Sequence, residues 1–209
     1  MSLLPASILH LFHRFRYALH GRRAGLGRPV PAAALDQEYI SGAWDHFFAP
    51  GELARHEALV GMIREACSRP RLLDLGCGSG RLASLLDPAA LESYLGVDLS
   101  AEGLRRAAAL KLPHGRFERH DFEIWTPPAG AYDVITFNEC LGYAADPLRT
   151  ARRFASALAP GGTLLVSHFR FMDHVKFWHR LERSFSFPVQ RVVTNAAGQT
   201  WDLRQLALR

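Results

Sequence analysis

Residues 72–80 read Leu-Leu-Asp-Leu-Gly-Cys-Gly-Ser-Gly, and residues 96–100 read Gly-Val-Asp-Leu-Ser. The first stretch is typical of a buried strand that runs into a glycine-rich turn, where the lack of a Cβ lets the backbone approach a ligand. The second reads as the next strand, which ends at Asp98. Asp98 follows Gly76 by 22 positions, a spacing at which a βαβ unit brings a carboxylate to ribose hydroxyls. Together they predict a site for a cofactor that contains adenosine.

The composition indicates one globular domain with one sizeable core, because the 209 residues are 48% hydrophobic and 22% charged. Apolar runs fall well short of the roughly 20 residues that span a bilayer, and basic residues interrupt the stretch where a secretory signal would lie. The three cysteines, Cys67, Cys77 and Cys140, lack metal-site spacing. We therefore expect reduced thiols, no metal site and a cytoplasmic location.

The net charge of +5 comes from an N-terminal arm, since residues 1–35 hold five arginines and no acid, whereas residues 36–209 hold basic and acidic residues in equal number. This uneven placement disfavours nucleic acid as a partner. Apolar residues from Ile8 to Leu19 recur at helical spacing and predict a basic amphipathic helix. Packing on its own domain, packing on a second subunit of a homodimer, weak contact of residues 1–30 with a membrane surface, and disorder all remain open for this arm.

Apolar strand-like runs alternate with helical segments from about residue 35 onward. Strands are expected at 71–75, 93–97, 116–119, 132–137 and 163–169, and helices at 35–49, 52–67, 80–86, 101–110, 147–158 and 173–183. This alternation predicts an α/β fold with a doubly wound parallel sheet. A closing hairpin, 189–194 with 200–206, is expected to add an antiparallel edge.

Five motifs, in this order along residues 35–209, resemble those of the class I S-adenosylmethionine-dependent methyltransferases. They are the acidic residue and glycines of 74–80, Asp98, the His-Asp-Phe of 120–122, the strand motif of 132–139, and the Leu-Ala-Pro-Gly-Gly run of 158–166. The resemblance implies a Rossmann-like seven-stranded sheet in the order 3-2-1-4-5-7-6, with strand 7 antiparallel, and N-terminal helices. It implies an arm and linker at 1–34 and a methyltransferase domain at 35–209, in which helices at 35–69 cover a cofactor-binding core at 70–209.

The resemblance also implies S-adenosylmethionine as cofactor and S-adenosylhomocysteine as product. Asp98 is expected to bind the ribose and Asp121 the adenine amino group, while Asp74 faces the methionine ammonium or, alternatively, staples the loop. Tyr39 and Trp44 are expected to cover the methionine end, or to serve ordinary helix packing. The full predicted cofactor site is Asp74, Gly76, Cys77, Gly78, Gly80, Asp98, Leu99, Asp121, Phe122, Asn138, Tyr39 and Trp44.

The implied reaction moves a methyl group to an oxygen or nitrogen of a small molecule, such as a sugar, a lipid-linked intermediate or a natural-product scaffold. The acceptor atom must present a lone pair, which favours a general base. His168 is the preferred candidate, with Glu139 and Tyr143 as further ones. The competing interpretations are a hydrogen-bonded histidine at a strand end and a solvated loop acid.

Two other functions remain as alternatives: a nicotinamide-dependent oxidoreductase on the same fold, and a catalytically degenerate donor-binding scaffold. In the glycine turn, Gly80 comes two residues after Gly78, whereas the usual dinucleotide-binding pattern has its third glycine three residues after the second. This spacing disfavours the first alternative, the oxidoreductase. The intact loop with Asp98 and Asp121 disfavours the second. Residues 138–141 also depart from the Asn/Asp-Pro-Pro-Tyr motif of enzymes that methylate bases or amide nitrogens, which disfavours methylation of DNA or of glutamine.

Overall fold

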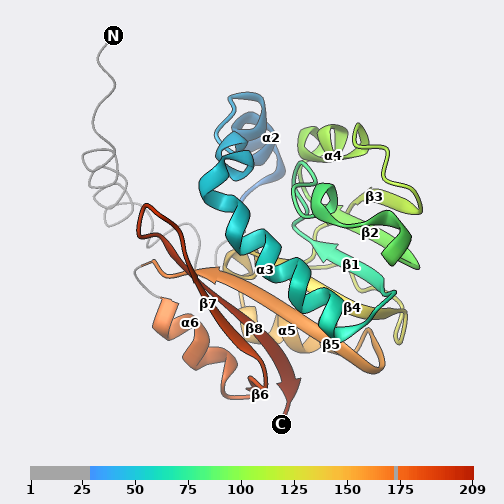
Figure 1. Ribbon diagram of the computed structural model, residues 1–209, viewed down its shortest axis with the longest axis vertical. Helices are drawn as coiled ribbons and strands as arrows, with labels where there is room; N and C mark the ends of the chain where they lie inside the picture. The colour runs from blue at the N-terminus through green and yellow to red at the C-terminus, as the bar shows by residue number, and fades with distance from the viewer. Residues whose placement is uncertain (1–28, 172–173) are drawn as a thin grey trace.

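The computed structural model describes residues 29–171 and 174–209, so the helix expected from Ile8 to Leu19 lies outside the described residues. One mixed sheet forms the centre of the molecule (Figure 1). Its parallel strands are β1 (Arg71–Leu75), β2 (Ser93–Asp98), β3 (Gly115–Arg119), β4 (Tyr132–Asn138) and β5 (Leu158–Phe169).

The closing strand β8 (Thr200–Leu208) runs antiparallel to β5, and β7 (Gln190–Thr194) and the short β6 (Phe185–Ser186) both pair with β8. The strand order β3-β2-β1-β4-β5-β8-β6 confirms the predicted topology, with β8 in the place of strand 7. Two strands, β6 and β7, pair with different parts of β8 at the edge where the prediction has only strand 6. The extra strand therefore lengthens the edge beside β8 and leaves the central order unchanged.

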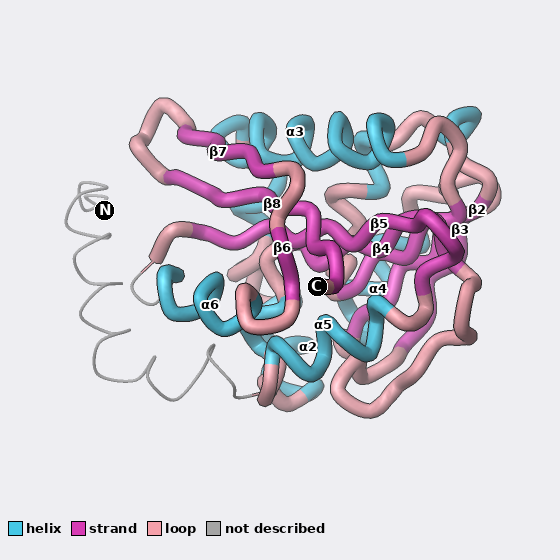
Figure 2. The backbone as a smooth tube through the Cα atoms, turned by 90° about the horizontal axis from the view of Figure 1, so that it is seen from below, coloured by secondary structure: helices cyan, strands magenta, loops and turns pink. Residues whose placement is uncertain are grey.

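Helices cover both faces of this sheet. They are α2 (Ala32–Ile40), α3 (Pro50–Ala66), α4 (Ala101–Ala108), α5 (Pro147–Ala155) and α6 (His174–Leu181), with short 3₁₀ helices η2 (Asp45–Phe48), η3 (Ala83–Leu85), η4 (Pro88–Ala90) and η5 (Leu141–Tyr143). Figure 2 shows α3 on one side of the strands and α5 and α6 on the other. Such layering is how a parallel sheet buries both of its faces.

Strand β1 contributes side chains to the hydrophobic cores on both faces of the sheet, because successive side chains of a strand point to opposite faces. Leu73 belongs to the cluster that contains Phe154 of α5. Leu72 belongs to the cluster that contains Leu59 and Ile63 of α3. All of these side chains are almost fully buried, and each contributes about 1.5–3 kcal/mol relative to exposure.

Two expected helices are wrong in extent. The helix expected at 35–49 ends at Ile40, because Ser41 and Gly42 close it with backbone bonds to Gln37 and Tyr39, and only the short η2 follows. The segment expected as a helix at 80–86 forms a turn and the three-residue η3. Asp87 caps the next short element, η4, which begins directly afterwards at Pro88.

The Pro-Gly-Gly run at 160–162, which precedes the strand expected at 163–169, lies inside β5 as a bulge. Tyr132 pairs with Leu158, whereas Val134 pairs with Thr163. β5 thus advances five residues while β4 advances two, which leaves three additional residues in β5. Within the described residues, no helix is both long and apolar enough to cross a membrane.

Gly96 of β2 has no space for a side chain. A Cβ built on it would lie 2.7 Å from the Phe117 ring and 2.9 Å from Cys77 Sγ. We predict that Gly96→Ala lowers the free energy of unfolding by about 1–3 kcal/mol, as overpacking of a core does. Urea denaturation measures the change. Gly51→Ala is the matched control, because its added methyl group would meet Asn195 at an ordinary 3.4 Å; equal midpoints for the two variants would contradict the prediction.

Candidate active site

The turn after β1 fits closely against the chain around it and requires glycine. Gly76 and Gly78 have φ of 65° and 53°, values that side-chain-bearing residues rarely adopt. A Cβ on Gly76 would lie 2.5 Å from Cys140 Cβ, and one on Gly78 would lie 2.3 Å from the Tyr39 hydroxyl. The loop therefore brings bare backbone against Cys140, which follows β4, and against Tyr39 of α2.

Asp98, at the end of β2, holds this turn. The Gly78 N–H donates to Asp98 Oδ2 at 2.8 Å, and the Ser100 N–H donates to Oδ1 at 2.8 Å. Burial raises the pKa of Asp98, while these backbone N–H groups act in the opposite direction. Each carboxylate oxygen has a second lone pair, so the group can accept further hydrogen bonds from a ligand.

A cavity of about 560 Å³ opens at the carboxyl ends of the strands, a volume within the range of small-molecule sites. Eleven of the predicted site residues line it: Tyr39, Trp44, Gly76, Asp98, Leu99, Asp121, Phe122, Asn138, Glu139, Tyr143 and His168. Among residues that the sequence analysis did not single out, Phe47, Glu52, Phe169, Phe171 and Trp201 also line it. Residues from distant parts of the chain thus share one site.

Four predicted residues lie behind the cavity wall. Asp74 accepts hydrogen bonds from the Tyr94 and Thr136 hydroxyls at 2.7 and 2.8 Å, and burial raises its pKa to about 6. This arrangement ties β1 to β2 and β4 through side chains. The other three are Cys77, Gly78 and Gly80. Cys77 is buried, and Gly80 packs against α4, where an added Cβ would lie 2.6 Å from Leu110.

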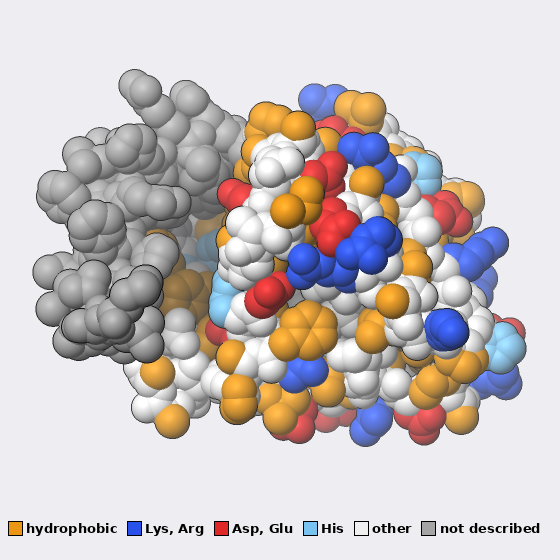
Figure 3. Space-filling view, turned by 90° about the horizontal axis from the view of Figure 1, so that it is seen from above, with side chains coloured by type: hydrophobic (Ala, Val, Ile, Leu, Met, Phe, Trp, Pro, Cys, Tyr) orange, Lys and Arg blue, Asp and Glu red, His pale blue; other side chains and the backbone are white. Residues whose placement is uncertain are grey.

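The covering segment, residues 32–48 with α2 and η2, is fastened to the start of α4. Asp36 Oδ1 accepts the Ser100 hydroxyl at 2.6 Å and the Glu102 N–H at 3.1 Å. Arg106 donates to the Tyr39 carbonyl at 2.7 Å and pairs with Asp45 at 2.9 Å. Figure 3 shows basic and acidic side chains close together on this end of the molecule. These contacts place Tyr39 over the glycine turn.

Trp44 supplies a polar atom that lacks a partner in the described structure. Its indole ring lies 5.4 Å from Phe47 and 6.0 Å from Tyr39, and its Nε1 is buried and without a hydrogen bond. Glu123 also lines the cavity, and its buried Oε1 is likewise unpaired. Buried polar atoms normally have partners, so an unpaired donor and acceptor in one cavity wall fit a site that binds a polar ligand.

Glu139 adopts a strained backbone conformation directly after β4, with φ of 63°. The Phe169 N–H donates to Glu139 Oε2 at 2.8 Å, and the Ser167 hydroxyl donates to Glu139 Oε1 at 2.7 Å. The backbone N–H of Glu139 in turn donates to Ser167 Oγ at 3.1 Å. Burial raises the pKa of Glu139, and the charge of Arg55 opposes the rise. Strain of this kind is maintained by surrounding contacts and clusters at functional sites.

Arg55 of α3 is a buried cation that the sequence analysis missed. Its Nε donates to Glu52 Oε2 at 2.5 Å and its Nη1 to Asn138 Oδ1 at 2.8 Å. Its guanidinium also lies 5.1 Å from the Phe47 ring centroid and 5.7 Å from that of Trp201. Glu52 and Arg55 occupy the same helical stripe as the buried Leu59 and Ile63, and a charged pair on an apolar stripe is the signal that could have identified it.

His168 lines the cavity near the end of β5. Its ring is stacked on Phe177 at 4.0 Å and meets Trp178 edge-on at 6.2 Å. Burial lowers the pKa of His168 to about 4. The imidazole is therefore neutral near pH 7 and a weaker base than an ordinary histidine.

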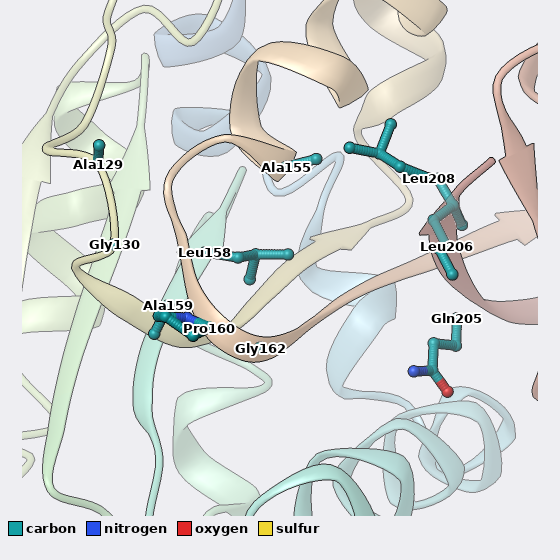
Figure 4. A pocket seen from close by; sticks show the side chains of 11 residues that line it. Ala129, Gly130, Ala155, Leu158, Ala159, Pro160, Gly162, Gln205, Leu206 and Leu208 are labelled. Carbon is teal, nitrogen blue, oxygen red and sulfur yellow. The ribbon is translucent and has the colours of Figure 1, made fainter.

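A second cavity, of about 650 Å³, lies at the opposite end of β5. Leu158, Leu206 and Leu208 form much of its wall, and Gln205 is its polar side chain (Figure 4). Ligands of open α/β sheets bind at the carboxyl ends of the strands, where the first cavity lies. Neither cavity has a metal cluster: residues 29–171 and 174–209 contain no group of three His, Cys, Asp or Glu side chains that could hold an ion.

The matching family model and two relatives of this chain are all described as methyltransferases. Residues 43–207 match the family model described as a methyltransferase domain. Trans-aconitate 2-methyltransferase of Deinococcus radiodurans is 34% identical over 139 residues, which is 65% of this chain and 51% of that protein. Ubiquinone biosynthesis O-methyltransferase of Bordetella avium is 34% identical over 101 residues, 46% of this chain and 42% of that protein. The chain thus spans about half or less of the length of these relatives.

Two solved structures share the fold. The N-methyltransferase NodS of Bradyrhizobium japonicum, in complex with S-adenosylhomocysteine, has a TM-score of 0.71 at 18% identity and covers 85% of this chain and 97% of that one. The [4+2]-cyclase SpnF has a TM-score of 0.68 at 16% identity, over 88% of this chain and 98% of that one. At such identities the likeness concerns the fold alone.

We predict that Arg55→Met destabilises the protein by about 3–5 kcal/mol, because it leaves the buried Glu52 carboxylate without its partner. Urea denaturation measures the loss. The control is Arg105→Met, since Arg105 pairs with Glu102 on the surface, with 70% of its side chain exposed, and it should change the midpoint little. Similar midpoints for both variants would contradict the structural role of Arg55.

We also predict that His168 makes the protein less stable in acid. The unfolded chain protonates this residue near pH 6.5, whereas the folded chain resists until about pH 4, so stability is lost as the pH falls through this window. Between pH 7 and pH 5, His168→Gln should lose about 2 kcal/mol less than the unsubstituted protein. Urea unfolding at both pH values measures this, with His179→Gln at an exposed site as the control. Parallel pH dependence in all three proteins would contradict the prediction.

Proposed function

Since this chain belongs to the class I S-adenosylmethionine-dependent methyltransferases, we propose that it methylates an oxygen or nitrogen of a small-molecule acceptor. The observation that carries the proposal is Asp98, which lines the cavity while it holds the glycine turn by the 2.8 Å bond from Gly78. This places a carboxylate with free lone pairs beside exposed backbone, which suits a nucleoside with a ribose diol.

The cavity residues fit the family's cofactor. Asp98 would accept the ribose hydroxyls, and Asp121 would accept from the adenine amino group beside Leu99 and Phe122. The unpaired Trp44 N–H would find an acceptor in the same ligand. When bound, S-adenosylmethionine supplies an activated methyl group, so the protein has chiefly to align the acceptor and exclude water.

The acceptor loses a proton as its oxygen or nitrogen gains the methyl group, and two cavity groups can accept that proton. His168 is neutral near pH 7 and keeps a lone pair on its ring, but burial lowers its pKa and makes it a weak base. Glu139 is fixed by its bonds to Ser167 and Phe169. Tyr143 lines the same part of the cavity and would orient the acceptor.

Isothermal titration calorimetry with S-adenosylhomocysteine and with NADH tests the cofactor class. We expect binding of the first and none of the second. The reverse result would favour the oxidoreductase alternative. Binding of S-adenosylhomocysteine without transfer of labelled methyl groups to any acceptor pool would favour a donor-binding scaffold.

We predict that Asp98→Asn weakens S-adenosylhomocysteine binding at least about tenfold, because a charged acceptor of two hydrogen bonds becomes neutral and in part a donor. Glu57→Gln, on the exposed side of α3, is the matched control and should leave the affinity unchanged. The circular dichroism of both variants checks that the fold is retained. Unchanged affinity of Asp98→Asn would remove Asp98 from the site.

A further inference from the structure

We propose that the acceptor part of the cavity selects ring-bearing amines and disfavours carboxylates. The proposal rests on the proposed function, which assigns the other part of the cavity to the methyl donor. It follows from which residues gather at the β5 and β8 side, and from the charges and ring faces that they present.

The cavity divides along the sheet order. Asp98 ends β2, whereas His168 lies near the end of β5, three strands away across β1 and β4. Neighbouring strands lie about 4.8 Å apart, so the two residues are separated by roughly 14 Å. An adenosine group held at Asp98 and Asp121 therefore leaves the region beside β5 and β8 to the acceptor.

Aromatic rings form much of this region. Phe169 lies 5.2 Å from Trp201 and 6.0 Å from Phe171, and all three line the cavity. Phe47 joins them from η2. The faces of such rings carry negative potential and attract cations. Phe47 and Trp201 already do so within the protein, because both lie close to the Arg55 guanidinium.

Carboxylates accompany these rings. Glu52 and Glu139 both line the cavity on this side. The Arg55 charge is engaged by Glu52 and Asn138, so a single cation stands against two carboxylates. Glu139 receives hydrogen bonds from Ser167 and Phe169 but has no direct ion pair among the contacts described for it. A positively charged nitrogen would satisfy this excess of negative charge, whereas a carboxylate would be repelled by it.

This selection would separate the chain from several relatives. Relatives at 30–39% identity carry the name of trans-aconitate, an anion. Acceptors of one shared scaffold and different charge therefore give the decisive comparison.

The test uses the full chain saturated with S-adenosylhomocysteine and three indole probes with equal two-carbon arms: tryptamine, tryptophol and indole-3-propionate. They carry a positive, a zero and a negative charge near pH 7. We expect calorimetry to rank their affinities in that order, with tryptamine at least tenfold tighter than indole-3-propionate. Equal or tighter binding of the acid would overturn the proposal, as would failure of all three to bind to protein that binds S-adenosylhomocysteine.

A variant locates the origin of the preference. Glu139→Gln keeps the size of the side chain and should reduce the ratio between tryptamine and indole-3-propionate to below threefold, whereas Glu57→Gln should leave the ratio unchanged. An undiminished ratio in folded Glu139→Gln would overturn the role of Glu139. The wild-type ranking decides the charge preference if that variant does not fold. Failure of S-adenosylhomocysteine itself to bind would instead refute the proposed function.

Discussion

The hydrogen bond from the Gly78 N–H to Asp98 is the contact on which the rest of the site depends. It joins the turn after β1 to the end of β2, so two adjacent parallel strands present one rigid edge. The turn can lie this close to Cys140 and Tyr39 only because Gly76 and Gly78 have no side chains. Every other element of the cavity is positioned relative to that edge.

On the other side of the cavity, charged and polar side chains position the strand ends, whereas backbone contacts do so at the glycine turn. Arg55 joins α3 to the end of β4 through Asn138, and Asn138 shares the Ser167 hydroxyl with Glu139. A buried cation, two carboxylates and an amide thus fix the ends of β4 and β5. Buried charges are tolerated only when they are paired and hydrogen-bonded, so this arrangement has few alternative geometries.

Local signals predicted the strand positions and the glycine turn, whereas the strand order and most of the cavity residues were implied by the resemblance to the methyltransferase family. Strand periodicity and the glycine turn specify β1, and the position of Asp98 follows from the chain length of one βαβ unit. The expected helix at 80–86 was wrong because 3₁₀ and α turns differ by one hydrogen-bond step, which composition does not resolve. The contact between Arg55 and Asn138 could not be predicted, because the two residues lie 83 positions apart and such pairs depend on tertiary packing.

The covering segment has an attachment that differs in kind from the rest of the fold. Residues 32–48 are held to α4 by the polar contacts of Asp36 and Arg106, and Asp45 is 65% exposed at one of them. Water competes well for such contacts, whereas the strands beneath are fixed by buried apolar packing. On heating, the covering segment should therefore detach before the strands separate, and substrates can enter and leave without any rearrangement of the sheet.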